Sequence, residues 1–173
     1  MYRLYQRISC GEEFHLDETY AKEILFQAAK NDDAFVIVSL HNKGLISLDA
    51  TDDEEKTAMF YANENRNINA LYELIKCDVN FELDDVDDDC AKHVLFKAAE
   101  MDSIHVIWRL HMVGLNFNAT DNEGKTAVFY ANKNKSSCAL CELIHCNINF
   151  KLDDIDDDCA KDVLFKAIGA DNS

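Results

Sequence analysis

The chain has 173 residues, of which 48% are hydrophobic and 10% aromatic, and its 33 acidic and 17 basic residues give a formal net charge of -16. This composition excludes a disordered chain, because enough apolar surface is present to form a core. The charge makes nucleic acid and anionic membranes poor partners, since both repel an acidic surface. It favours a protein partner with a basic or mixed surface.

The N-terminal residues 1–17 carry charges where a signal peptide would need an uninterrupted apolar stretch. No apolar run approaches the roughly 20 residues that span a bilayer. The seven cysteines are an odd number without an export signal, which is typical of reduced thiols. We therefore expect a cytoplasmic protein in a cytosol-like reducing compartment, either of the cell that produces it or of a host cell. A nuclear location is also compatible with these features.

Whole segments recur along the chain. KTAMFYAN at residues 56–63 returns as KTAVFYAN at 125–132, and AKEILFQAA at 21–29 has counterparts at 91–99 and 160–168. The copies are 69 or 70 residues apart. Phenylalanines mark a finer period of 33 to 36 residues, at Phe26, Phe60, Phe96, Phe129 and Phe165. A period of this length is typical of repeat arrays, in which each unit buries its apolar face against its neighbours. The spacing predicts Phe129 in the core that the stacked units share.

Each unit is expected to contain two antiparallel helices. In the second unit a short helix begins near Lys56, and a second helix follows the polar stretch NENRN, because apolar residues recur there at helical spacing. The Thr57 hydroxyl can cap the first helix. Gly44 and Gly114 follow the second helices of their units, where a residue of positive φ commonly ends a helix.

These segments resemble the ankyrin-repeat family. DNEGKTAVFYAN at 121–132 is similar to the opening D-x-x-G-x-T-P-L-H-x-A-A of that repeat, and ELIKCDVN at 73–80 and ELIHCNIN at 142–149 are similar to its close. The sequence departs from the pattern: Ala58 and Ala127 replace the proline, and phenylalanine replaces the histidine in every unit. The rival tetratricopeptide repeat would need its own Trp/Gly/Tyr/Pro pattern, which is absent.

The resemblance implies an all-α, ankyrin-like solenoid of stacked helix-turn-helix units. We expect residues 1–17 to be an N-terminal segment or cap, and residues 18–173 to be the repeat domain. Its units are expected to start near residues 18, 52, 88, 121 and 157, the last being partial.

The resemblance further implies a non-enzymatic protein-interaction module, an adaptor or an inhibitor, which binds through the turn tips and the inner face of the first helices. The sequence contains no phosphate-binding or catalytic motif, and we expect no cofactor. At the turn tips and in the recurring lysine position, the expected partner-binding residues are Asp53, Glu54, Asp89, Asn122, Glu123, Lys22, Lys56, Lys92, Lys125 and Lys161. At the ends of the first helices they are Glu64, Asn65, Glu100, Met101, Lys133 and Asn134. A pathogen or viral protein that acts in a host is one compatible source.

The acidic tracts LDDVDDDC and LDDIDDDC invite two other interpretations. Asp85, Asp87 and Asp89 alternate as in a calcium loop, but Cys90 occupies the place of the required glycine and Phe96 that of the final glutamate. We expect an extended acidic turn instead. The alternative function is an acidic mimic of nucleic acid that blocks a nucleic-acid-binding protein through these aspartates.

Cys138 and Cys141 form a C-x-x-C motif, followed by His145 and Cys146. Zinc sites usually draw their ligands from two separated pairs. All four residues fall on one predicted helix, whose geometry does not converge them on one ion. The expectation is packed thiols and no metal.

Overall fold

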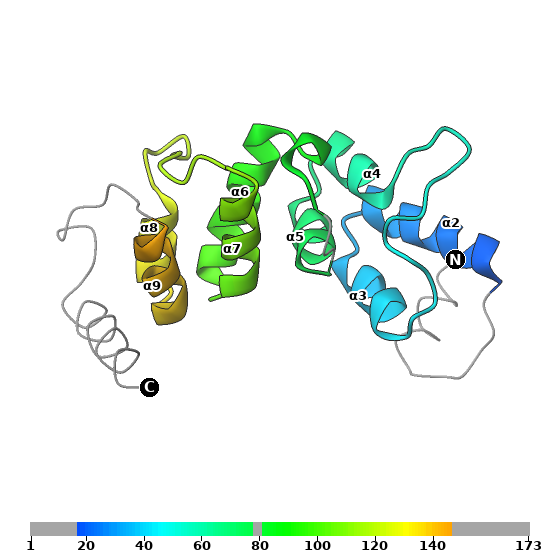
Figure 1. The fold of residues 1–173 in the computed structure, drawn as a ribbon, viewed down its shortest axis with the longest axis horizontal. Coiled ribbons are helices and arrows are strands. Elements are labelled where there is room, and N and C mark those ends of the chain that lie inside the picture. Colours follow the sequence, from blue (N-terminus) through cyan, green and yellow to red (C-terminus); the bar gives the residue numbers. More distant parts are fainter. Residues whose placement is uncertain (1–16, 78–80, 147–173) are drawn as a thin grey trace. The chain divides into compact units, whose positions relative to one another are not determined.

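A computed structural model of the chain describes residues 17–77 and 81–146. The chain divides into two compact units, residues 1–90 and 91–173, and each is described by itself. Apart from a single bridge between Thr51 and Thr57, the regular elements of the described residues are helices. In chain order they are α2 (Glu18–Lys30), α3 (Ala34–Asn42), α4 (Ala58–Glu64), α5 (Ile68–Cys77), the 3-10 helix η1 (Leu83–Asp85), α6 (Asp88–Glu100), α7 (Ile104–Met112), α8 (Ala127–Lys133) and α9 (Ser137–His145) (Figure 1). The prediction of an all-α protein is confirmed.

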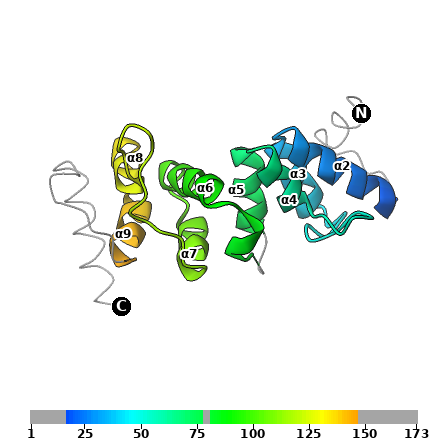
Figure 2. The same cartoon turned by 90° about the horizontal axis from the view of Figure 1, so that it is seen from above.

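The N-terminal unit contains two helix pairs, α2–α3 and α4–α5. Helix α2 packs against α3 and α4, and α3 packs against α5, so that the first helices lie side by side and the second helices form another row (Figures 1 and 2). The largest side chains that are fully buried in this unit are Leu25, Val36, Ile37, Leu40, Leu71, Leu74 and Ile75. The apolar residues at helical spacing therefore form the core, as expected.

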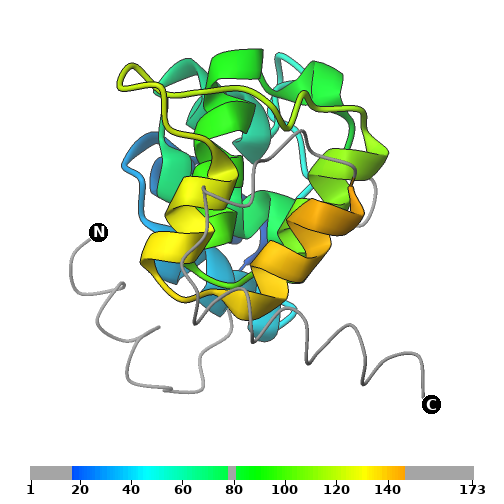
Figure 3. The same ribbon diagram turned by 90° about the vertical axis from the view of Figure 1, so that its left-hand side faces the viewer.

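The C-terminal unit repeats this arrangement. Helix α9 packs against both α7 and α8 (Figure 3). Its fully buried large side chains include Leu95, Ile107, Leu110, Leu140 and Leu143. No helix among the described residues combines the length and the apolar character needed to cross a membrane.

The predicted helix ends are confirmed. The Thr57 hydroxyl accepts a hydrogen bond from the N–H of Phe60 at 3.2 Å and so caps α4. Gly44 has a φ of +60° and ends α3, with the N–H of Leu45 donating to the carbonyl of Leu40 at 3.1 Å. Gly114 ends α7 in the same way. Each glycine adopts a left-handed conformation that other residues reach only with strain.

The first helices alternate in length, which the sequence period did not predict. Helices α2 and α6 have 13 residues each, whereas α4 and α8 have 7. A threonine caps α4 and α8 at their start, after a tight loop, while α2 and α6 begin about two turns earlier relative to the recurring lysine. The structural unit that repeats is therefore a set of two helix pairs, in agreement with the duplication of 69 or 70 residues.

Side chains from one helix pair cap the next pair in each unit. In the N-terminal unit, Asp32 accepts a bond at 2.8 Å from the N–H of Ala70, in the first turn of α5. In the C-terminal unit, Asp102 accepts the equivalent bond at 2.7 Å from the N–H of Ala139 in α9. Asp32 and Asp102 both have positive φ, at 56° and 54°. These bonds satisfy N–H groups that a helix cannot pair internally.

The acidic tract at residues 84–89 is not the extended turn that we expected. It forms η1 and the first turn of α6. The Asp87 carboxylate accepts hydrogen bonds from the N–H groups of Asp89, at 3.1 Å, and Cys90, at 2.9 Å, and so caps α6. Asp89 pairs with Arg66 at 3.1 Å. An N-cap aspartate and the helix dipole explain why acidic residues favour a helix start here. The second tract lies outside the described residues.

The recurring phenylalanines do not share one environment. Phe26 and Phe96 are buried, at 9% and 5% exposure, and each contacts a tyrosine of the next helix pair, Tyr61 and Tyr130 respectively. Phe60, in contrast, is 39% exposed. Phe129 is half-buried, so its expected place in the core is wrong. Within α8 the buried side chains are instead those of Ala127, Val128 and Ala131.

Candidate functional site

The loop before α4, residues 51–57, is called the first finger. Its turn is organised by one carboxylate: Asp52 Oδ1 accepts hydrogen bonds from the N–H groups of Glu54, at 2.9 Å, and Lys56, at 3.0 Å, while Oδ2 accepts a bond from the Tyr61 hydroxyl. The hydrogen bond from the Tyr61 hydroxyl has the largest effect on the pKa of Asp52 and lowers it, and the bond from the Lys56 N–H lowers it further. The same Asp–Tyr bond raises the pKa of Tyr61. The finger is therefore fastened to the helix that follows it.

The second finger, residues 120–126, repeats this geometry in the C-terminal unit. Asp121 Oδ1 accepts from the N–H groups of Glu123, at 2.8 Å, and Lys125, at 2.9 Å, and Oδ2 accepts from the Tyr130 hydroxyl at 2.6 Å. The bond to Asp121 raises the pKa of Tyr130 to about 12, and the bond from Tyr130 lowers the pKa of Asp121. Gly124 turns the chain with a φ of +77°.

A lysine, a glutamate and a phenylalanine form a recurring group beside each finger. Lys56 pairs with Glu54 at 2.8 Å and its Nζ lies 4.9 Å from the centre of the Phe60 ring. The hydrogen bond to Glu54 raises the pKa of Lys56. In the second finger Lys125 makes the same contacts, with Glu123 and with Phe129 at 4.9 Å from the ring centre. Both lysines are thus electrostatically paired, and each holds its finger against an aromatic ring.

The tips of the fingers are exposed. Asp53 and Glu54 lie at the tip of the first finger, and Asn122 and Glu123 at the tip of the second. The first finger reads DDEEK at residues 52–56 and the second DNEGK at 121–125. The first therefore carries four acidic side chains against one lysine, and the second two against one.

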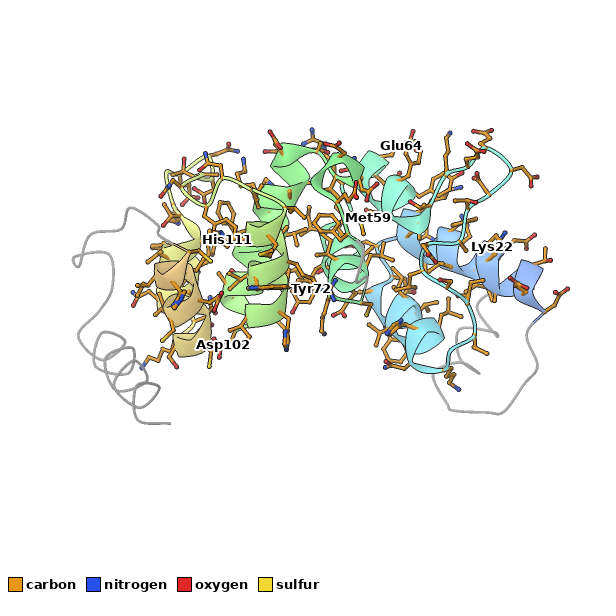
Figure 4. All side chains as sticks on the ribbon, in the orientation of Figure 1. Lys22, Met59, Glu64, Tyr72, Asp102 and His111 are labelled. Atoms are coloured by element: carbon orange, nitrogen blue, oxygen red, sulfur yellow. The ribbon has the colours of Figure 1, made fainter. Side chains whose placement is uncertain are left out.

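The last residues of α4 and α8 are exposed to solvent. Glu64 and Lys133 are exposed at equivalent positions, and Figure 4 shows Glu64 at the outer edge of α4 while Met59 lies inside the helix pair. Asn65 Nδ2 donates to the carbonyl of Tyr61 at 2.8 Å, and Asn134 makes the equivalent bond. The two asparagines therefore help to end their helices, while the charged residues before them remain accessible.

The predicted residues of the other two helix pairs have different surroundings. Lys22 and Lys92 were expected at the turn position that Lys56 occupies, but they lie inside α2 and α6, where they are half-buried (Figure 4 labels Lys22). Asp89 lies in the first turn of α6 rather than at a turn tip. Glu100 and Met101 are exposed at the end of α6. Lys161 lies outside the described residues.

Helix α9 carries the C-x-x-C motif. Cys138, Cys141 and His145 lie on α9 and Cys146 follows it directly, so the prediction of a one-helix arrangement is confirmed. Burial and the nearby Glu142 raise the pKa of Cys146 to about 11, which keeps this thiol protonated at neutral pH. Within the described part of the chain, no three His, Cys, Asp or Glu side chains are placed to hold a metal ion.

Sequence reasoning missed the residues that organise the fingers. Asp52 with Tyr61, and Asp121 with Tyr130, share a separation of nine residues in both copies, and this recurrence was a readable signal. No sequence signal distinguished the exposed Phe60 from its counterparts Phe26 and Phe96, which are buried.

The chain is similar to solved structures of other proteins. No family model matches the chain, and no curated protein does. A solved ankyrin repeat domain from Acinetobacter baumannii AYE is 22% identical, with 72% of this chain and 81% of that domain covered and a TM-score of 0.34. The ankyrin-like repeat fold of the described residues follows from their recurring helix pairs, glycine-ended second helices and aspartate-anchored fingers.

Proposed function

We propose that the chain is a protein-interaction module, an adaptor or an inhibitor, which binds its partner through the two fingers and the exposed side of α4 and α8. The observation that carries this proposal is the exposure of Phe60 beside a fastened finger. The fold buries the phenylalanines of α2 and α6, so stability alone does not require an exposed ring at this position. Exposed aromatic rings are common anchors of protein interfaces.

The fingers are also organised before any partner binds. Each is held by three hydrogen bonds to one carboxylate and by a lysine that lies over a phenylalanine ring. An ordered loop loses less conformational entropy on binding than a mobile one. The tip residues Asp53 and Asn122 are exposed, and within the described part of the chain neither side chain forms a hydrogen bond or an ion pair. They are therefore available to a partner.

The partner proposed for the first finger has a basic or mixed surface, because Asp53, Glu54 and Glu55 are exposed there beside a lysine that Glu54 already pairs. The five cysteines of the described residues form no disulfide among them, which supports a reducing, cytosol-like compartment. The acidic-mimic alternative is less well supported, since the carboxylates of Asp87 and Asp89 already cap α6 and pair with Arg66.

Affinity capture with paired variants tests this function. The tagged chain is compared with two variants. The finger variant combines Phe60→Ala with Asp53→Lys, and the control variant carries Asn42→Lys at the exposed end of α3. We expect the finger variant to lose a partner that the control retains, with both melting temperatures close to that of the unmodified chain. Equal capture by all three proteins would refute the proposed surface.

Salt separates this function from the acidic mimic. A mimic that replaces nucleic acid should lose its partner steeply between about 50 and 200 mM salt, because that contact is almost wholly electrostatic. An interface anchored by Phe60 should keep most of its partner over the same range.

A further inference from the structure

Helix α7 exposes a row of large apolar side chains on its outer side. Ile104, Trp108 and Met112 follow one another at a spacing of four, and they are 40%, 53% and 64% exposed. Met101, in the turn before the helix, extends the row and is 60% exposed. This spacing puts the three helical residues on one face, while Val106, Ile107 and Leu110 point into the core. We call these four exposed residues the α7 stripe.

The fold does not require an apolar stripe at this position. Helices α3 and α9 have the same core pattern as α7 but other residues on this face. In α3 the equivalents of Ile104, Trp108 and Met112 are Ala34, Val38 and Asn42, and in α9 they are Ser137, Cys141 and His145. Contiguous exposed apolar side chains of this size commonly mark an interaction surface. Tryptophan and methionine are enriched in interfaces, and the only tryptophan of the chain lies in this stripe.

The ionisable side chains of α7 itself, His105, Arg109 and His111, are basic, whereas Glu100 and Asp102 flank Met101 at the start of the stripe. No acidic residue occurs between Ser103 and Thr120, although the chain has 33 acidic residues. His105 and Arg109 lie along α7 next to Trp108, and no carboxylate of the described residues forms an ion pair with Arg109. Of the two acidic residues beside Met101, Asp102 already caps α9 through Ala139 (Figure 4 labels Asp102), and Glu100 is exposed.

We propose that the α7 stripe binds an acidic amphipathic helix of a partner protein. The apolar row of such a helix would cover Ile104, Trp108 and Met112, since helices pack with their rows of side chains interdigitated. Glutamates beside that row would meet Arg109 and His105. The net charge of -16 repels an acidic partner mainly at longer range, and salt screens such repulsion beyond roughly 8 Å. A second copy of this chain fits less well, because it would bring two Arg109 side chains and two acidic proteins together.

This site is separate from the fingers. Three residues of the stripe lie on the second helix α7 and Met101 lies in the turn before it, whereas the fingers precede the first helices α4 and α8. A chain that lost partner binding at the fingers would still bind a helix at α7, so the two proposals fail independently.

Trp108 itself reports the binding. The test probes are two synthetic helical peptides of about five turns with the same leucine row, one flanked by glutamates and one by lysines. We expect the glutamate peptide to shift the tryptophan emission to shorter wavelength in a saturable titration. The lysine peptide, which the net charge of the chain would favour, should give no saturable shift. Tighter binding of the lysine peptide would overturn the proposal.

Matched variants keep the reporter in place. Ile104→Ala combined with Met112→Asn installs the residues of α3 and should weaken the glutamate peptide about tenfold or more, as truncation of interface anchors does. Arg109→Glu should reverse the preference in favour of the lysine peptide. The control Asn42→Met, at the equivalent position of α3, should leave the titration unchanged. Unaltered affinity in the first two variants would contradict the assignment.

Two measurements on the free protein complete the test. We expect the emission of Trp108 to be that of a solvent-exposed indole and independent of protein concentration. An emission typical of a buried indole would show that the chain itself covers the stripe. A concentration-dependent shift with a doubled mass in light scattering would assign the stripe to self-association. Either result would overturn the proposal.

Discussion

Asp102 Oδ1 accepts a hydrogen bond at 2.7 Å from the N–H of Ala139, 37 residues later in the chain. The carboxylate of one helix pair thereby caps the second helix of the next pair. Ser136, which precedes α9 and occupies its N-cap position, makes no side-chain cap bond and instead donates its hydroxyl to the carbonyl of Glu100 at 3.1 Å. Cooperativity between neighbouring helix pairs therefore has a defined polar component beside the apolar core.

Replacement of Asp102 should measure this cap. Asp102→Gly keeps the positive φ of 54° accessible but removes the acceptor, and it should lower the free energy of unfolding by about 0.5 to 1.5 kcal/mol, the net contribution of one hydrogen bond. Asp102→Asn retains both an acceptor oxygen and tolerance of that φ, so its loss should be clearly smaller. Urea denaturation of the two variants checks this. Equal losses would show that the bond to Ala139 contributes nothing.

The buried and half-buried phenylalanines of the C-terminal unit should differ in their effect on stability. Phe96 is 5% exposed and stacks on Tyr130 at 5.1 Å, so Phe96→Ala should cost about 3 to 5 kcal/mol, as for other core aromatics. Phe129 contacts Lys125 and Tyr130 from a half-buried position, and Phe129→Ala should cost about 1 kcal/mol. Denaturant titration of both variants gives the comparison, and a larger loss for Phe129 would contradict the structure.

The repeat period and the composition were sufficient to predict the helix pairs, because apolar spacing, Thr57 and Gly44 act locally. The environment of each phenylalanine was not predictable. Phe26 and Phe60 occupy the same place in their repeats, but Phe26 is covered by Tyr61 of the next pair, and burial of this kind depends on the neighbour. In the same way, the alignment of Lys22 with Lys56 gave no information about the longer helix around Lys22. An equivalent position in the repeat therefore does not determine whether a residue lies in a helix or in a loop. The residues that precede it determine this more strongly.

The bond between Tyr130 and Asp121 should make stability depend on pH. The pKa of Tyr130 is raised to about 12, above its ordinary value, so the contribution of this bond is complete below about pH 10 and disappears as the pH rises through 12. The pKa of Asp121 is lowered, so at acid pH the contribution is present above about pH 4 and disappears as the pH falls below it.

Tyr130→Phe tests this dependence. We expect the variant to melt below the unmodified chain at pH 7, and the difference to shrink at pH values where Asp121 is protonated. Absorbance of tyrosinate should also show that the variant has lost an ionisation step near pH 12. A melting difference that stays constant from neutral to strongly acid pH would exclude Asp121 as the partner.

Removal of metal should leave the protein unchanged. Cys138, Cys141 and His145 lie along a single helix, and their side chains are not placed to hold one ion together. Treatment with a chelator should therefore not alter the melting temperature, which calorimetry can measure. Stoichiometric zinc in protein purified without added metal would show that the interpretation of these thiols is wrong.

The central claim is that the fingers contact the partner. Site-specific photocrosslinking tests it directly, with a photoreactive phenylalanine analogue placed at position 53 or 122 and, as controls, at the exposed positions 42 and 145 at the ends of α3 and α9. We predict that irradiation in lysate from the relevant cells gives an adduct of the same mass from positions 53 and 122 and none from 42 and 145. Adducts from 42 and 145 alone would contradict the claim.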